Sequence, residues 1–148
     1  MTAPARRRLV VDACVVAKWQ LDDEEETAAA LALRDDLLIA EEIEVHAPTL
    51  LTYELTNIIH NAARKARLEP ARAEEALSNL LACPIELHAP EPLRVLAIAR
   101  ECALAAYDAA YVALAERLGA ELWTADRPLY TRSGKKFRWV RWIGEYLR

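Results

Sequence analysis

The sequence predicts an α/β fold of three layers, in which a central parallel sheet of four to five strands has helices on both faces. Short apolar runs alternate along the chain with longer segments whose apolar residues recur at helical spacing. Alternating strands and helices form parallel sheets, because each crossover lays a helix on one face of the sheet. The 148 residues, 54% of them hydrophobic, match the size of one compact domain. We therefore expect residues 1–148 to form a single domain.

Three strands and four helices are expected as far as His88. The first strand is an apolar run, residues 9–11, that is too short for a helix and ends at Asp12. The acidic run 22–26 is typical of a helix start, because carboxylates are favoured at that end of the helix dipole. Pro48 begins a helix whose apolar residues share one face. In order, the expected elements are strand 8–12, helices 14–20 and 23–39, strand 44–47, helices 49–66 and 70–82, and strand 85–88.

The rest of the chain is expected to contain three more helices and two more strands. One helix has an apolar stripe that starts at Tyr107 and ends at Gly119. The strand after it is broken at Pro128, as by a helix start. Trp and Val of the last strand are expected in the core, although their alternation with arginines also suits an RNA-stacking surface. In order, the elements are helices 91–103 and 107–118, strand 121–124, a short helix after Asp126, strand 137–140, and a terminal turn or helix.

Four carboxylates lie at positions that the predicted fold brings to one place. Asp12 and Asp126 come just after strands, and in an open α/β sheet the carboxyl ends of the strands border the ligand crevice. Glu54 lies on a polar stripe beside the apolar face of helix 49–66, and Asp108 lies in the first turn of helix 107–118. Taken singly, each acid also fits a turn, a helix cap, a dipole partner or a solvated surface. Their joint placement favours one acidic site.

Such a site needs protons or a cation. Two carboxylates ~4 Å apart repel by ~4 kcal/mol at an effective dielectric constant near 20, so three close ones approach ~12 kcal/mol. A whole domain is stable by only roughly 5 to 15 kcal/mol. Oxygen ligands without a nearby cysteine or histidine pair favour the hard ions Mg²⁺ or Mn²⁺. We therefore expect Mg²⁺, with Mn²⁺ as a plausible substitute.

Several classes of protein are excluded by composition. No stretch approaches the roughly 20 apolar residues of a membrane span, so a cytoplasmic location is expected. Only three glycines are present, and no glycine-rich phosphate loop occurs. The cysteines and histidines lack the spacing of a disulfide framework, a zinc site or a nucleophile triad. They are Cys14, Cys83 and Cys102, and His46, His60 and His88.

Charge is segregated along a chain whose net charge is -4. Residues 20–45 contain ten acids and one base, whereas residues 127–148 contain seven bases and one acid. A nucleic-acid backbone is therefore a possible ligand of the basic end.

The chain resembles PIN-domain ribonucleases, and in particular the VapC toxins of prokaryotic toxin-antitoxin pairs. The resemblance covers nearly the whole chain and is carried by Val10-Val11-Asp12-Ala13 with Val16-Ala17-Lys18-Trp19, Ala47-Pro48 with Tyr53-Glu54-Leu55-Thr56-Asn57, Ala106-Tyr107-Asp108-Ala109-Ala110-Tyr111-Val112-Ala113-Leu114-Ala115, and Thr124-Ala125-Asp126. It implies that Asp12, Glu54, Asp108 and Asp126 form the catalytic metal site.

The resemblance also implies a function. A Mg²⁺-dependent endoribonuclease is expected, the toxin of a type II toxin-antitoxin system, which hydrolyses RNA to leave 5′-phosphates and forms a homodimer. A VapB-like antitoxin partner is expected to place an arginine in the acidic pocket. Cys14 departs from the family, whose members carry Ser or Thr there, and a thiol is the weaker hydrogen-bond donor. Asn57, Thr124 and Cys14 are expected to orient the metal ligands.

Other functions were compared with this one. A receiver-like domain needs an adjacent acidic pair, and a haloacid-dehalogenase-type phosphatase needs D-x-D, whereas this chain has Asp12-Ala13-Cys14. A PIN-fold nuclease that processes RNA without being a toxin remains an alternative. So does a non-catalytic RNA-binding scaffold of the same fold, although a scaffold has no reason to retain four mutually repelling acids.

Overall fold

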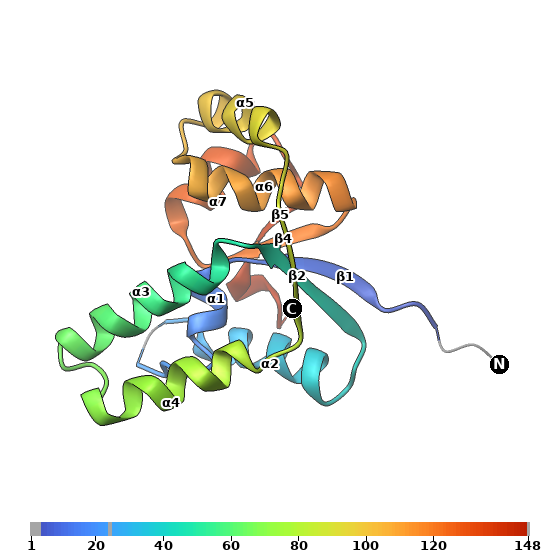
Figure 1. The fold of residues 1–148 in the computed structure, drawn as a ribbon. Helices are drawn as coiled ribbons and strands as arrows, with labels where there is room; N and C mark the ends of the chain where they lie inside the picture. The colour runs from blue at the N-terminus through green and yellow to red at the C-terminus, as the bar shows by residue number, and fades with distance from the viewer. Residues whose placement is uncertain (1–3, 24, 148) are drawn as a thin grey trace.

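The computed structural model describes residues 4–23 and 25–147 and shows a parallel sheet between two layers of helices (Figure 1). Five strands alternate with helices, which confirms the predicted α/β class. In chain order the elements are β1 (Arg7–Val11), α1 (Ala13–Ala17), α2 (Thr27–Leu38), β2 (Ile43–Pro48), α3 (Leu51–Arg64), α4 (Pro70–Leu81), β3 (Ile85–His88), α5 (Pro92–Cys102), α6 (Ala106–Leu118), β4 (Glu121–Thr124), α7 (Arg127–Gly134), β5 (Val140–Trp142) and the 3-10 helix η1 (Ile143–Glu145).

The strand order of the sheet reverses between β1 and β4, where open α/β sheets generally leave a ligand crevice at the carboxyl ends of the strands. All neighbours pair in parallel, in the order β3-β2-β1-β4-β5. From β1 the chain adds strands in one direction, and from β4 it adds β5 in the other. Val11 of β1 pairs with Trp123 of β4, so Asp12 and Thr124 follow at the same level of the sheet. In sheets of this kind, ligands bind where the order reverses, because the connections leave the two strands on opposite faces.

The helices cover both faces. Helix α6 packs on β1, β2 and β4 with α5 outside it, and α7 packs on β4 and β5. Helices α1 and α2 contact the sheet from the other side, and α3 and α4 form a helical pair that projects beyond it (Figure 1). Since both faces are covered, Leu9, Val10 and Val11 are all completely buried.

Among the helices of the described ranges, none has the length and apolar character needed to span a membrane. That the full chain is a single domain stays a prediction.

The segment before α2 differs from the prediction. Helix α2 begins at Thr27 rather than at residue 23. Glu26 has a left-handed backbone (φ 62°), which a helix interior does not allow, and Asp22, Asp23 and Glu25 lie outside the helix. Glu24, which was part of the expected helix start, lies outside the described residues.

Two further details of the prediction are wrong. Strand β5 begins at Val140 rather than at residue 137, because turns continue after α7: the Phe137 N–H donates to the Ser133 carbonyl (2.8 Å) and the Val140 N–H to the Phe137 carbonyl (3.0 Å). Val140 is buried, as expected, and Trp142 only partly so. Tyr107 is 70% exposed instead of core. The first turn of α6 borders the crevice, where no layer covers it.

Candidate active site

Asp12 and Asp126 occupy the crevice between β1 and β4, and each also caps a helix. The Val15 N–H donates to Oδ1 of Asp12 (3.1 Å) at the start of α1, and the Leu129 N–H donates to Oδ1 of Asp126 (3.0 Å) at the start of α7. A capping carboxylate stabilises a helix and is itself held in one orientation. The capping role and a place in an acidic site are therefore compatible.

Glu54 and Asp108 reach the crevice from helices. Glu54 lies in the first turn of α3 and Asp108 in the first turn of α6. Both side chains are partly exposed, whereas Asp12 is 3% exposed. The Tyr111 hydroxyl donates to Oε1 of Glu54 (2.7 Å), which links α6 to α3.

The four carboxylates, which we call the acidic cluster, interact electrostatically, and the pKa values of Asp12, Glu54 and Asp108 are raised. Burial is the main cause for Glu54, whose pKa is also raised by the negative charges of Asp12, Asp108 and Asp126. Burial and the charge of Asp126 raise the pKa of Asp108. Burial raises the pKa of Asp12 to about 6, a rise that its hydrogen bonds limit and the charge of Asp126 increases. Glu54 and Asp126 thus each lie within electrostatic reach of the other three acids.

Two side chains expected to orient the ligands do contact Asp12. The Cys14 thiol donates to Oδ1 (3.0 Å), and the Thr124 hydroxyl donates to Oδ2. Thr124 Oγ1 also accepts the Asp126 N–H (2.9 Å), so it joins the two strand-end acids. Burial and the charge of Asp12 raise the pKa of Cys14 well above its usual value, which keeps the thiol protonated as a donor. Asn57 is exposed and makes no side-chain hydrogen bond within the described residues, so its role stays a prediction.

Tyr111 has a second part that the sequence did not predict. Its position in the apolar stripe of α6 predicts a buried ring, and the ring is buried, at 1% exposure. Its hydroxyl nevertheless reaches Glu54 on another helix. Asp108 and Tyr111 are three residues apart and therefore share a face of α6. This spacing is the sequence signal that could have placed the Tyr111 hydroxyl near the acidic site.

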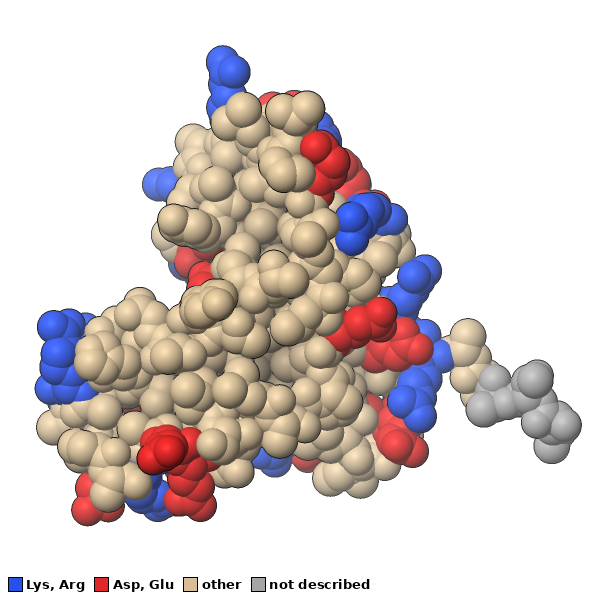
Figure 2. All heavy atoms as spheres, in the orientation of Figure 1, with Lys and Arg blue, Asp and Glu red and all other residues tan. Residues whose placement is uncertain are grey.

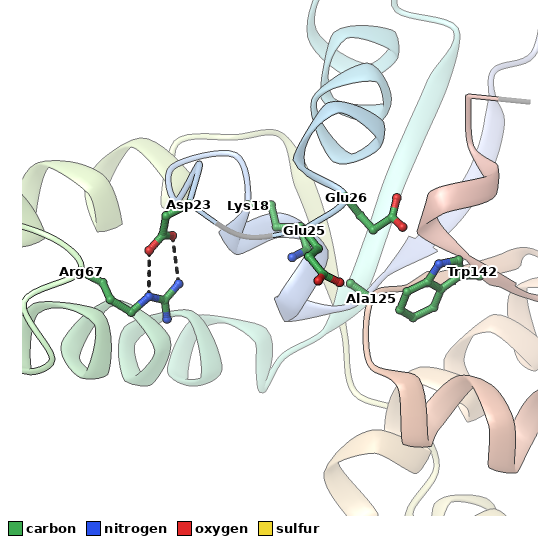
Figure 3. A pocket seen from close by; sticks show the side chains of 7 residues that line it. All are labelled: Lys18, Asp23, Glu25, Glu26, Arg67, Ala125 and Trp142. Atoms are coloured by element: carbon green, nitrogen blue, oxygen red, sulfur yellow. Dashed lines mark hydrogen bonds and ion pairs between the residues drawn. The ribbon is translucent and has the colours of Figure 1, made fainter.

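A polar pocket of about 480 Å³ is lined in part by Ala125, the residue between Thr124 and Asp126 (Figure 3). None of the four acids of the acidic cluster lines it. At one end Arg67 forms a two-bond ion pair with Asp23 (3.0 Å for each bond), and the other end is bounded by the indole of Trp142. Its remaining lining residues are Lys18, Glu25 and Glu26.

Figure 2 shows a notch in one face of the molecule. The notch separates the layer of α5 and α6 from the arm formed by α3, and acidic side chains lie at its base. Basic residues lie close to the same region: the Arg132 cation of α7 lowers the pKa of Asp108. A polyanion at the notch would therefore meet both the acids and a flanking positive charge.

Comparison with known proteins places the chain in a family. The model of the PIN domain matches residues 9–134. Ribonuclease VapC3 of Pyrobaculum aerophilum is 32% identical over 126 residues, which is 82% of this chain and 92% of that protein. The crystal structure of PAE2754, also from Pyrobaculum aerophilum, superposes with a TM-score of 0.65 at 28% identity and covers 94% of this chain and 92% of that one.

A more distant structure has the same fold. FitAcB from Neisseria gonorrhoeae superposes with a TM-score of 0.51 at 19% identity, over 84% of this chain and 92% of that one. Together with the parallel five-stranded sheet, these matches confirm the resemblance noted in the sequence. The chain belongs to the PIN domain family.

Proposed function

We propose that the protein is a metal-dependent endoribonuclease and the toxin of a type II toxin-antitoxin pair. The observation that carries the proposal is the acidic cluster, in which the charge of Asp126 raises the pKa values of Asp12, Glu54 and Asp108 at the strand-order reversal. The similarity to Ribonuclease VapC3 supplies the substrate class.

The donor set of the acidic cluster fits a hard divalent cation. Its ligands are all carboxylate oxygens, which suit Mg²⁺ and Mn²⁺. Asp12 is buried beside Asp126, and its carboxylate accepts hydrogen bonds from the Cys14 thiol, the Val15 N–H and the Thr124 hydroxyl. A bound cation would neutralise this charge. We propose Mg²⁺ as the ion, held by Asp12, Asp108 and Asp126 with Glu54.

Within the proposed site, the side chains of this chain orient one another and hold protons. When bound, the cation supplies Lewis acidity and positive charge for the attacked phosphate. Glu54 would accept the proton that the attacking water loses, and its raised pKa moves it toward the range of a useful base at neutral pH. Tyr111 holds the Glu54 carboxylate in place, as Cys14 and Thr124 hold that of Asp12. Arg132 attracts the RNA backbone.

The partners belong to the same proposal. A VapB-like antitoxin would bind the notch and place an arginine against the acidic cluster, where it competes with metal and RNA. The protein itself is proposed to form a homodimer. Light scattering at micromolar concentration tests the dimer, and a monomeric mass would contradict it.

A cleavage assay tests the activity. The purified protein should cut RNA with added Mg²⁺, stop in EDTA, and regain activity when Mg²⁺ is restored in excess. The products should carry 5′-phosphates, which a 5′-phosphate-dependent exonuclease detects. RNA binding without cleavage under every metal condition would instead favour the non-catalytic scaffold.

A further inference from the structure

A second group of possible metal ligands lies on β2 and β3, apart from the acidic cluster. His46 of β2 pairs with Glu86 of β3, and His88 follows Glu86 by two residues. Residues two apart on a strand point to the same face, and residues paired across parallel strands also share a face. The three side chains, which we call the histidine cluster, therefore project together. They share no residue with the acidic cluster.

The ligand atoms of the histidine cluster lie at metal-site separations. Nδ1 of His46 is 2.9 Å from Nε2 of His88 and 3.6 Å from Oε2 of Glu86, and the three ligand atoms all lie within 4.8 Å of one another. Two nitrogens bound to one tetrahedral zinc ion at about 2.0 to 2.1 Å are about 3.3 Å apart. To admit the ion, the two nitrogens need to separate by a few tenths of an ångström and both rings need to turn so that their lone pairs meet at it.

A fourth side chain prepares His46 as a ligand. Nε2 of His46 lies 3.2 Å from Oε1 of Glu44, on the same strand and face. This contact places the proton of a neutral His46 on Nε2 and leaves the Nδ1 lone pair directed at His88 and Glu86. Histidines that bind metals commonly donate their other N–H to a carboxylate, which fixes the tautomer and makes the ligand more basic. Glu44 therefore plays a positioning part.

Burial and charge around the cluster favour an ion that enters from solvent. The side chain of His46 is 4% exposed and that of Glu86 is 68% exposed, so one ligand is fixed in the protein and another borders water. Burial, His46 and the Arg117 cation lower the pKa of His88, so its imidazole is neutral at neutral pH, the form that binds metals. Arg117 opposes a cation, and the carboxylates of Glu44 and Glu86 offset it.

We propose that His46, Glu86 and His88 bind a divalent transition-metal ion, Zn²⁺, with a water molecule as the fourth ligand. Two imidazoles and a carboxylate are a ligand set that zinc takes in proteins, whereas Mg²⁺ prefers oxygen ligands alone. In the metal-free protein, the two histidines share a hydrogen bond in its place. The inference stands apart from the proposed nuclease activity, because it concerns other residues and another ion.

Co²⁺ and Zn²⁺ titrations in excess Mg²⁺ test the proposal, since Mg²⁺ occupies oxygen sites and competes weakly for imidazoles. Wild-type protein should bind one equivalent of Co²⁺ with the visible absorption of a tetrahedral site, and Zn²⁺ should displace it. His88→Ala should weaken binding by about 100-fold or more, and Glu44→Gln by about tenfold. The matched control is His60→Ala, because His60 is an exposed histidine of α3 outside the cluster.

A second variant protects the test against misfolding. Glu86→Gln changes an exposed side chain and should keep the wild-type circular dichroism spectrum while weakening Zn²⁺ binding at least tenfold. Equal binding by wild type, His88→Ala and Glu86→Gln would overturn the proposal. So would the absence of stoichiometric Co²⁺ binding in the folded wild type, or a loss in His60→Ala as large as in His88→Ala.

Discussion

The acidic cluster and the histidine cluster are assembled from the chain in different ways. The acidic cluster draws its four acids from α3, α6 and the residues just after β1 and just before α7, so only the complete fold brings them together. The histidine cluster uses two neighbouring strands and a single register. The first consists of carboxylates that repel one another, whereas the second is hydrogen-bonded without a metal. A cation is therefore needed more by the unbalanced charge of the acidic cluster than by the close spacing of ligands in the histidine cluster.

The largest effect on RNA cleavage is expected when an acid of the acidic cluster, rather than another acid, is replaced. Asp12→Asn should lower Mg²⁺-dependent RNA cleavage by about 10²- to 10³-fold or more, because it removes a fixed charge at the reacting centre. The exposed Asp22 provides the control, and Asp22→Asn should cleave RNA at the wild-type rate. Single-turnover kinetics would measure both. Full cleavage by Asp12→Asn would remove Asp12 from the proposed site.

The two clusters should respond to pH in opposite directions when metal is absent. The pKa of Asp12 rises from 3.8 to about 6 on folding, so its ionisation destabilises the fold above pH 6, and this cost disappears as the pH falls from about 6 to 4. The pKa of His88 is lowered from 6.5, so protonation below that value favours the unfolded chain.

Urea unfolding in EDTA measures the contribution of Asp12 to this pH dependence. Asp12→Asn should be more stable than wild type by about 3 kcal/mol at pH 8 and nearly equal to it at pH 4, because a shift of about two pKa units corresponds to that free energy. If the difference in unfolding free energy is the same at both pH values, folding does not raise the pKa of Asp12.

Removing one hydroxyl should have a smaller effect. Tyr111→Phe deletes the hydrogen bond that lowers the pKa of Glu54, so the acidic limb of the pH–rate profile should move to higher pH. The cleavage rate should fall by about tenfold, the cost of losing one hydrogen bond to a charged group. Tyr53→Phe is the control, because Tyr53 is 80% exposed on α3. An unchanged profile would leave Tyr111 with a packing role only.

The smallest effect is expected at the position where the chain departs from its family. Cys14→Ser puts a stronger donor beside Asp12 and should lower the pKa of that carboxyl, which moves the acidic limb to lower pH by less than about one unit. Cleavage should stay within a few-fold of wild type. Cys83→Ser is the matched control. A shift to higher pH would mean that the thiol is the better donor.

The sequence predicted the fold well because local signals mark it, and the same signals led to the prediction of the acidic cluster. Asp12 and Asp126 follow strands directly, and the carboxyl ends of parallel strands share one edge. Tyr107 was misassigned because helical spacing does not reveal where the covering layer ends. The start of β5 was missed because the turns after α7 depend on hydrogen bonds that no residue pattern marks.

The histidine cluster lay beyond sequence reasoning for a related reason. His46 and His88 are 42 residues apart and meet only through the register of β2 and β3. The i, i+4 spacing that places two histidines on one helix face does not apply to residues on two different strands. The hydrogen bond from Tyr111 to Glu54, across 57 residues, was hidden in the same way.

Binding of Mn²⁺ to the acidic cluster tests the central claim most directly, because it needs neither the RNA target nor the antitoxin. Electron paramagnetic resonance should detect tight Mn²⁺ binding by the wild type that Mg²⁺ displaces. Asp108→Asn and Asp126→Asn should each weaken it by about tenfold or more, since each removes a ligand charge. Wild-type affinity in both variants would contradict the claim that these distant carboxylates form one cation site.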